Sequence, residues 1–267
     1  MKGKGPLENI KVLITRGSEG SSETASLIED VGGVPIVVPL LHFQPHEDVW
    51  ETNLHTTIHT YEWIIFTSKN GVKFFLQALK RLQLDLSSFS GKFAAVGSKT
   101  EHYCRKSGIP VSFVPDHFTG DDFADEFISK VKPSGDVLIP KGNLARNVIA
   151  SELASAGVSC QEWIVYETVL PEGCIGQLKD SIEEEKPDII TFTSSSTVHH
   201  FMKVVDQHSL HDKIQDIPIA CIGPITKSTA EQYGLHVKIC PSIYTVNEMV
   251  NEMVNEMKKF ITNRSSQ

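Results

Sequence analysis

The chain has 267 residues, of which 40% are hydrophobic and 22% are charged, the composition of a folded globular protein. This composition excludes collagen-like, low-complexity and disordered chains. The 25 Lys and Arg residues stand against 33 Asp and Glu, a formal net charge of −8, so the chain lacks the basic field expected of a nucleic-acid-binding protein. At about 100–150 residues per domain, the length predicts two domains.

The hydrophobic segments of the sequence are short. The longest apolar run, 34–41, contains two prolines and falls far short of the about 20 residues that a membrane-spanning helix needs. The residues before the first predicted strand, 11–15, include no apolar segment of the length found in signal peptides. We therefore expect a cytoplasmic protein without a membrane-spanning segment.

The cysteines and histidines do not follow metal-ligand spacing. The five cysteines never form a Cys-x-x-Cys pair, which predicts reduced and mainly buried thiols. The 11 histidines include the adjacent pair His199 and His200, which point in different directions on a helix, and the others lack a carboxylate-rich ligand pattern. No metal site is expected.

Apolar, β-rich segments alternate with amphipathic segments along the whole chain, the pattern of parallel α/β units. Strands are predicted at 11–15, 34–38, 61–66, 93–96, 111–114, 136–139, 159–167, 188–193, 218–222 and 236–239. Helices are predicted at 21–31, 70–82, 100–107, 121–131, 143–156 and 226–233, followed by a last helix with Met249, Met253 and Met257 on one face. Because helices separate the strands, each sheet is expected to be parallel and buried on both faces.

Segments of the first half recur in the second half at a nearly constant distance. The matching pairs are 63–68 with 189–194 and 93–100 with 219–226, both shifted by 126 residues, and 12–14 with 137–139, shifted by 125. Coincidence explains single matches but not a shared offset. Duplication of a unit of about half the chain is the better explanation, and it predicts two similar α/β lobes.

The loops that follow strands are the candidate sites, because open parallel sheets bind ligands at the carboxyl ends of their strands. Four such loops carry small hydroxyl residues or glycine and then begin a helix: 66–70, 96–100, 192–196 and 222–226. Backbone amides at a helix N-terminus can hold an anion. The same residues can also serve only as N-caps that stabilise the helices, and both interpretations stay open.

A few charged and phenolic side chains are further candidates. Arg16 and Arg146 each follow a strand and could form a bidentate pair with a substrate carboxylate. Lys141, beside Arg146, is expected to be a solvated surface charge. Tyr166 ends a strand, where it could donate to a leaving hydroxyl or simply pack. Phosphate-loop, dinucleotide and nucleophile-elbow motifs are absent from the sequence, so nucleotide-driven chemistry and triad hydrolysis have no support.

Taken together, these residues resemble the uroporphyrinogen-III synthase family, whose motifs occur in the same order and spacing over residues 11–257. The motifs are Ile14-Thr-Arg16, Ile65-Phe-Thr-Ser68 with Gly71-Val72, Ala95-Val-Gly97 with Thr100, Lys141-Gly-Asn143 with Arg146, Val165-Tyr166 with Thr168, Phe192-Thr-Ser194 with Ser196, and Ala220-Cys-Ile-Gly223-Pro with Thr226.

The resemblance implies an interleaved architecture that the duplication alone does not predict. Two α/β lobes, each a parallel sheet flanked by helices, are joined by a two-stranded linker. The first lobe takes 1–40 and 169–267, the second takes 45–164, and the linker strands are 41–44 and 165–168. The family's active site lies in the cleft between the lobes.

The resemblance also implies the activity: a cofactor-free hydro-lyase that cyclises hydroxymethylbilane to uroporphyrinogen III, with loss of water and inversion of the terminal pyrrole ring (ring D), in heme and tetrapyrrole biosynthesis. The alternative is a catalytically silent two-lobed protein of the same fold that binds or senses an anionic ligand. The expected partners are the linear tetrapyrrole substrate and, transiently, hydroxymethylbilane synthase, with no nucleic acid or membrane partner. A monomer is expected.

The family's functional residues carry over to matching positions of this sequence. Tyr166 and Thr226 match the catalytic positions. The substrate-binding positions are Arg16, Thr67, Ser68, Gly97, Thr100, Gly142, Asn143, Arg146, Ser194, Ser196 and Gly223.

Overall fold

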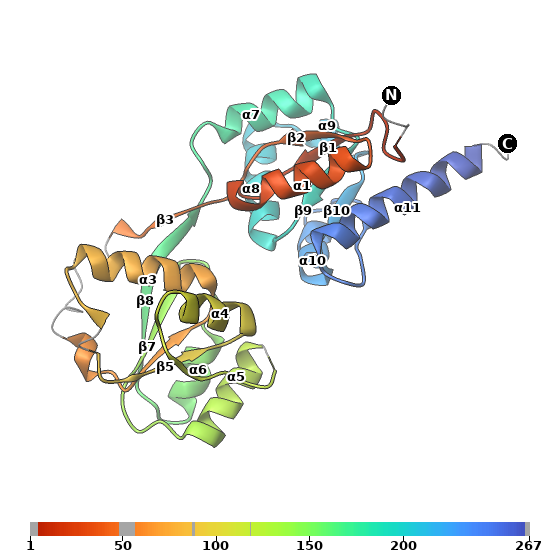
Figure 1. The fold of residues 1–267 in the computed structure, drawn as a ribbon. Coiled ribbons are helices and arrows are strands. Elements are labelled where there is room, and N and C mark those ends of the chain that lie inside the picture. The colour runs from red at the N-terminus through yellow and green to blue at the C-terminus, as the bar shows by residue number, and fades with distance from the viewer. Residues whose placement is uncertain (1–4, 48–56, 87–88, 118, 265–267) are drawn as a thin grey trace. The chain divides into compact units, whose positions relative to one another are not determined.

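A computed structural model describes residues 5–47, 57–86, 89–117 and 119–264 (Figure 1). It divides into two compact units, unit 1 (Met1–His42 and Val169–Gln267) and unit 2 (Phe43–Thr168). Within the described ranges, no helix is both long enough and apolar enough to cross a membrane.

Unit 1 is built on a five-stranded parallel sheet with the order β11-β10-β9-β1-β2. Its strands are β1 (Lys11–Ile14), β2 (Val34–Val37), β9 (Ile189–Phe192), β10 (Ile219–Cys221) and β11 (Val237–Ile239). Its helices are α1 (Ser18–Asp30), α7 (Cys174–Asp180) continued by the π-helical η5 (Ser181–Glu185), α8 (Ser195–His208), α9 (His211–Ile214), α10 (Pro224–Gln232) and α11 (Val246–Arg264).

Unit 2 is built on a six-stranded sheet with the order β3-β8-β7-β4-β5-β6, whose pairs from β8 to β6 are parallel. Its strands are β3 (His42–Pro45), β4 (Trp63–Phe66), β5 (Lys92–Ala95), β6 (Val111–Phe113), β7 (Val137–Gly142) and β8 (Cys160–Val169). Its helices are η2 (Ile58–Thr60), α3 (Lys69–Arg81), α4 (Ser98–Lys106), α5 (Gly120–Glu126) continued by the π-helical η4 (Phe127–Val131), and α6 (Val148–Ser155).

Each sheet buries both faces, because alternate residues of its strands point to opposite helix layers. In unit 2, Ile64 joins the apolar cluster under α3 and α4, whereas its neighbour Ile65 joins the cluster under α5 and α6. In unit 1, Leu13 faces α7, α8 and α10, whereas Val12 faces α1 and α11. The methionines of α11 behave as expected, since Met249 and Met253 are fully buried in that last cluster.

The two units repeat one architecture, as the offset between sequence segments predicts. The orders β6-β5-β4-β7-β8 and β11-β10-β9-β1-β2 match strand for strand. Helices α3, α4 and α5 begin 126 residues before α8, α10 and α11. Even the register irregularity between Phe93 and Ala94 recurs between Ile219 and Ala220. The prediction of two similar α/β lobes with parallel sheets is confirmed.

Some predicted element limits need correction. The helix predicted over 143–156 begins only at Val148, because 143–147 form a loop tied to β7 and β8. Helix α7 with η5, over 174–185, and helix α8, over 195–208, overlap none of the predicted helices. The chain passes between the units near 42 and 168, and the linker strands 41–44 and 165–168 stay a proposal.

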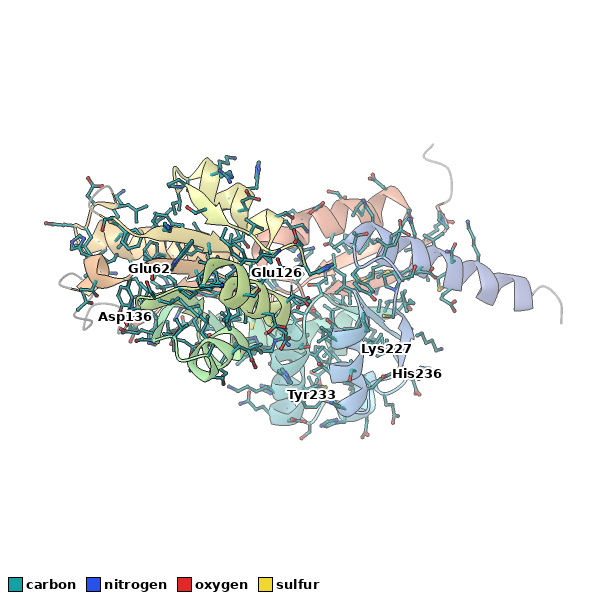
Figure 2. All side chains as sticks on the ribbon, turned by 90° about the horizontal axis from the view of Figure 1, so that it is seen from below. Glu62, Glu126, Asp136, Lys227, Tyr233 and His236 are labelled. Carbon is teal, nitrogen blue, oxygen red and sulfur yellow. The ribbon has the colours of Figure 1, made fainter. Side chains whose placement is uncertain are left out.

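Glu62 links the amino ends of β4, β5 and β7 by hydrogen bonds. It is labelled together with Asp136 in Figure 2. Glu62 N donates a hydrogen bond to Asp136 O, and Glu62 O accepts one from Lys92 N, both at 2.8 Å. Its carboxylate accepts hydrogen bonds from the backbone amides of Ser134, at 2.9 Å, and Gly135. These amide donors stabilise the charged form and lower the pKa of the Glu62 carboxyl below its ordinary value.

The Glu62→Gln variant should be less stable than the wild type by about 1 kcal/mol at neutral pH, because an amide accepts these bonds less strongly than a carboxylate. The contribution is present above the unfolded-state pKa of about 4.3 and is lost as the pH falls through the lower folded-state pKa. Urea unfolding at pH 7 and near pH 3 measures it.

The difference between the variant and the wild type should therefore shrink in acid. An equal difference at both pH values would contradict the assignment. Glu152→Gln, on the exposed face of α6, is the control and should change stability at neither pH.

Candidate active site

Unit 2 contains a pocket of about 410 Å³ at the carboxyl end of its sheet. Its walls come from the end of β4, from β7 and β8, and from the first residues of α5 and α6. Four predicted site residues line it, namely Thr67, Ser68, Arg146 and Tyr166. All of its lining residues belong to unit 2.

Thr67 and Ser68 join β4 to α3 at the pocket. Ser68 has extended backbone angles and accepts a hydrogen bond from Gly71 N at 3.0 Å, the geometry of an N-cap. Gly71 has to be small here, since a Cβ would lie 2.9 Å from Pro140 O in β7. The loop therefore caps α3 and also lines the pocket, whereas anion binding at this loop stays a prediction.

Tyr166 is 8% exposed and lies between aromatic rings. It stacks on Phe74 of α3 at a centroid distance of 5.2 Å and meets Phe43 edge-on at 5.7 Å. These contacts fix the ring, and within the described part of the chain its hydroxyl makes no hydrogen bond. A phenol so placed is available to donate to a ligand in the pocket.

A bulge in the β7–β8 ladder determines where Tyr166 lies. Lys141 pairs with Ile164, but the next residue, Gly142, pairs with Tyr166, so that Val165 is skipped. The Tyr166 ring then lies against Gly142, where a Cβ would be 2.4 Å from Cζ and 2.8 Å from the hydroxyl oxygen. Gly142, predicted as a substrate contact, thus also provides the space for the tyrosine.

The expectation that Lys141 is a solvated surface charge is wrong. Its side chain is 5% exposed and forms an ion pair with Glu162 of β8 at 2.8 Å. The ammonium also donates to Asn147 Oδ1 and to Arg146 O. Lys141 lies within β7, and its side chain points into the protein. The Glu162 carboxylate of the neighbouring strand β8 balances the charge of the buried ammonium.

The loop 143–147 connects this pair to the pocket. Asn143 N donates to Tyr166 O at 3.1 Å, and Asn143 Oδ1 accepts from Thr168 N at 3.0 Å. This side-chain oxygen therefore holds the loop on β8. Arg146 lines the pocket, and no ion pair links it to another described residue.

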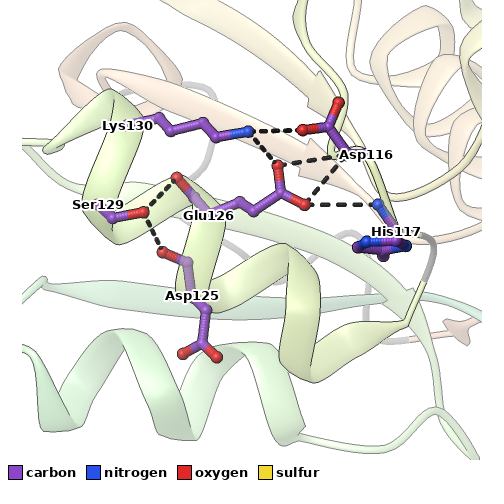
Figure 3. A network of polar contacts seen from close by, with 6 residues as sticks. All are labelled: Asp116, His117, Asp125, Glu126, Ser129 and Lys130. Atoms are coloured by element: carbon purple, nitrogen blue, oxygen red, sulfur yellow. Dashed lines mark hydrogen bonds and ion pairs between the residues drawn. The ribbon is translucent and has the colours of Figure 1, made fainter.

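Sequence reasoning missed the wall formed by Thr119 and Gly120. Thr119 caps α5 by accepting from Asp122 N at 3.1 Å. The loop before it is held by Glu126, which accepts from the amides of Asp116 and His117 and pairs with Lys130 at 2.7 Å (Figure 3). Thr119 and Thr245 are a further match of the repeat, 126 residues apart, and this match could have indicated the wall, since Thr245 caps α11 in the same way.

The unit 1 candidates lie at equivalent strand ends of their own sheet. Ser194 caps α8 by accepting from Thr197 N at 3.3 Å, and Ser196 follows it in the first turn. Gly223 precedes α10, and Thr226 in the first turn of that helix is only 5% exposed. Arg16 follows β1 beside Gly20, where a Cβ would lie 2.1 Å from Arg16 Nε.

Four predicted residues of unit 2 do not line the pocket, namely Gly142 and Asn143, described above, and Gly97 and Thr100. Gly97 precedes α4, next to the lining residue Val96, and Thr100 in the first turn of α4 is 7% exposed. Thr100 and Thr226 hold the same position in repeated helices and share their burial. Neither is brought to the pocket of unit 2, so their functional roles stay predictions.

The cysteines and the possible metal ligands of the described residues form no second candidate site. Cys104, Cys174 and Cys221 are buried as predicted, and burial raises the pKa of Cys104 and Cys221 to about 12, which keeps both thiols protonated. Across 5–47, 57–86, 89–117 and 119–264, no three His, Cys, Asp or Glu side chains gather where they could hold a metal ion.

Comparison with known proteins extends over most of the chain. A family model described as uroporphyrinogen-III synthase HemD matches residues 22–251. A Methanocaldococcus jannaschii protein provisionally named uroporphyrinogen-III synthase is 31% identical over 245 residues, which are 90% of this chain and 96% of that protein. The uroporphyrinogen-III synthase of Chlorobaculum parvum is 28% identical over 236 residues, 87% of this chain and 93% of the relative.

A solved structure has the same fold. A mutant uroporphyrinogen III synthase from the extremely thermophilic bacterium Thermus thermophilus matches with a TM-score of 0.67 at 17% identity, and the match covers 94% of this chain and 99% of the Thermus chain.

The close approach of Gly142 and Tyr166 leads to a stability prediction. Gly142→Ala should destabilise the protein by about 2 kcal/mol, because the new methyl group overlaps the Tyr166 ring. In a Tyr166→Ala background the same substitution should cost much less, and urea unfolding of the double-mutant cycle measures the difference. An equal cost in both backgrounds would refute the contact.

Gly176→Ala in α7 is the matched control. A Cβ at Gly176 meets nothing within 4 Å, so this variant should be as stable as the wild type or slightly more stable.

Proposed function

Because this chain belongs to the uroporphyrinogen-III synthase family, we propose that it is a lyase that converts hydroxymethylbilane to uroporphyrinogen III, with loss of one water and inversion of the terminal pyrrole ring. This reaction is a step of heme and tetrapyrrole biosynthesis. The observation that carries the proposal, beside family membership, is the pocket of unit 2, which collects Tyr166, Arg146, Thr67 and Ser68 from three strand ends.

The chemistry needs little activation and much positioning. The pyrrole nitrogen supplies electrons as the C–O bond of the hydroxymethyl group breaks, so the hydroxyl leaves as water once it receives a proton, and a stabilised azafulvenium cation forms. The substituted α-carbon of the terminal ring attacks this cation to give a spiro intermediate. The bond between that carbon and its original methylene bridge then breaks, the bridge bonds to the other α-carbon of the ring, and loss of the proton from this carbon yields the inverted ring. Holding a flexible octa-anion in the geometry for this closure is the main catalytic task.

Tyr166 is proposed to donate the proton or hydrogen bond that helps the hydroxyl to leave. The aromatic contacts with Phe74 and Phe43 hold the ring, and Gly142 allows it to reach its place. A phenol carries one O–H that can donate a hydrogen bond. Tyr166 can therefore supply this hydrogen bond to the departing hydroxyl.

Each unit is proposed to offer donors for substrate carboxylates at its own strand ends. In unit 2 these are the Arg146 guanidinium and the hydroxyls of Thr67 and Ser68. In unit 1 we propose Arg16 and the amides and hydroxyls at the starts of α8 and α10, with Thr226 supporting the first turn of α10. Mostly uncharged donors suit a chain of net charge −8, because they act over short distances without long-range attraction.

The finer features of the proposal are a monomer that works in the cytoplasm and receives its unstable substrate by transient transfer from hydroxymethylbilane synthase. The alternative, a silent anion-binding protein of the same fold, is not favoured by the named relatives.

A coupled assay tests the function. Purified protein is added to hydroxymethylbilane synthase and porphobilinogen, and the products are oxidised and separated into porphyrin isomers. Free hydroxymethylbilane closes without inversion to uroporphyrinogen I. We expect isomer III to predominate in proportion to the added protein, whereas isomer I alone would refute the enzymatic function.

The Tyr166→Phe variant should lower kcat by about tenfold, less than the loss of a full general acid because the leaving group departs readily. Its stability should stay close to that of the wild type, because the hydroxyl makes no hydrogen bond to a described residue. Turnover in the coupled assay and urea unfolding measure the two effects.

Tyr61→Phe is the matched control, since Tyr61 is buried in the same unit and bonds Gln161 outside the pocket. It should lose about 1 kcal/mol of stability and keep its turnover. Unchanged turnover in Tyr166→Phe would remove Tyr166 from the mechanism.

A further inference from the structure

We propose that Lys141 is a positioning residue for this reaction: its ammonium holds the loop 143–147 so that Arg146 lines the pocket. The inference rests on the proposed function. Lys141 was expected on the solvated surface. Its proposed role explains why the Lys141–Glu162 ion pair is buried beside the pocket.

The geometry of Lys141 supports this role. Its side chain is 5% exposed, and Nζ lies 2.8 Å from Glu162 Oε1 on the adjacent strand β8. The same Nζ donates to Arg146 O at 3.4 Å and to the side-chain oxygen of Asn147. The Lys141 ammonium, from the strand before the loop, therefore holds the last two residues of the loop, Arg146 and Asn147.

The ammonium has no hydrogen left for a substrate. A lysine ammonium carries three N–H donors, and these three acceptors use all of them. Lys141 could bind a substrate carboxylate only by releasing the loop or Glu162. Glu162, which also lines the pocket, balances the charge of Lys141. The charge left for an anionic ligand is that of Arg146.

The loop is held in its second half by the Lys141 ammonium and by two backbone hydrogen bonds, from Ala145 N to Gly142 O at 3.1 Å and from Ser151 N to Asn147 O at 2.9 Å. Its first half is fixed on β8 by the two hydrogen bonds of Asn143, to Tyr166 O and from Thr168 N. Leu144 is 57% exposed and so contributes little packing. The Lys141 contacts to Arg146 O and Asn147 bind the far end, directly before α6 begins at Val148.

The test is a variant that removes the clamp without leaving a buried charge. Lys141→Met alone leaves the Glu162 carboxylate without its ion-pair partner and should lower the stability of the protein. The double variant Lys141→Met with Glu162→Gln should regain most of the lost stability. If Lys141 positions the loop, the double variant still loses about tenfold in kcat/KM and forms more isomer I. Lys141→Arg, which keeps the charge and the donors, should recover part of the activity.

Coupling to Arg146 separates positioning from general stability. Arg146→Ala should lower kcat/KM in the wild-type background. Adding the Lys141→Met and Glu162→Gln pair to Arg146→Ala should then reduce kcat/KM by less than about threefold further, because the residue that the clamp positions is already gone. Lys106→Met, at the exposed end of α4, is the control and should match the wild type in stability and activity.

Two results would overturn the proposal: wild-type kcat/KM in the double variant, or a full additional loss when the pair is combined with Arg146→Ala. Both are read against a wild-type chain that forms isomer III. A wild-type chain that forms only isomer I refutes the proposed function itself, so the two failures are distinguishable.

Discussion

The site depends on one close approach between neighbouring strands, the Tyr166 ring lying over Gly142. The bulge in the β7–β8 ladder pairs these two residues, and the missing Cβ leaves room for the ring. Phe74 and Phe43 then hold the phenol at the carboxyl end of the sheet. Around this point the Lys141–Glu162 pair and the bonds of Asn143 fix the loop that carries Arg146. Backbone register, rather than a single strong interaction, places the Tyr166 phenol.

Unit 1 contains a related close approach at the equivalent position. Gly17 and Leu41 of unit 1 lie 125 residues before Gly142 and Tyr166. There too the glycine is needed, since a Cβ at Gly17 would lie 2.7 Å from Leu41 O. Both units thus bring the strand-end glycine against the following crossing segment, but only unit 2 carries a phenol at that point. The shared fold gives both units the same strand-end geometry, and Tyr166 is a side chain that distinguishes unit 2 from unit 1 at this position.

The sequence predicted what depends on local pattern and repetition: the strands, the parallel sheets, the paired lobes, and the strand-end loops with Ser68, Arg146 and Tyr166. It failed where a side chain's surroundings depend on a distant neighbour. Lys141 is buried because Glu162, 21 residues later, lies on the adjacent strand, and no local pattern encodes that pairing. The wall at Thr119 was missed because its loop is placed by Glu126, although the repeat with Thr245 could have indicated it.

The central claim is that the pocket of unit 2 places the Tyr166 phenol against the tetrapyrrole. The most direct measurement is NMR of protein labelled with carbon-13 at tyrosine Cζ, titrated anaerobically with uroporphyrinogen III, with the five tyrosine signals assigned by single Tyr→Phe variants. The account predicts that the Tyr166 signal moves on binding, while that of Tyr61, outside the pocket, stays in place. A saturated complex with an unmoved Tyr166 signal would contradict it.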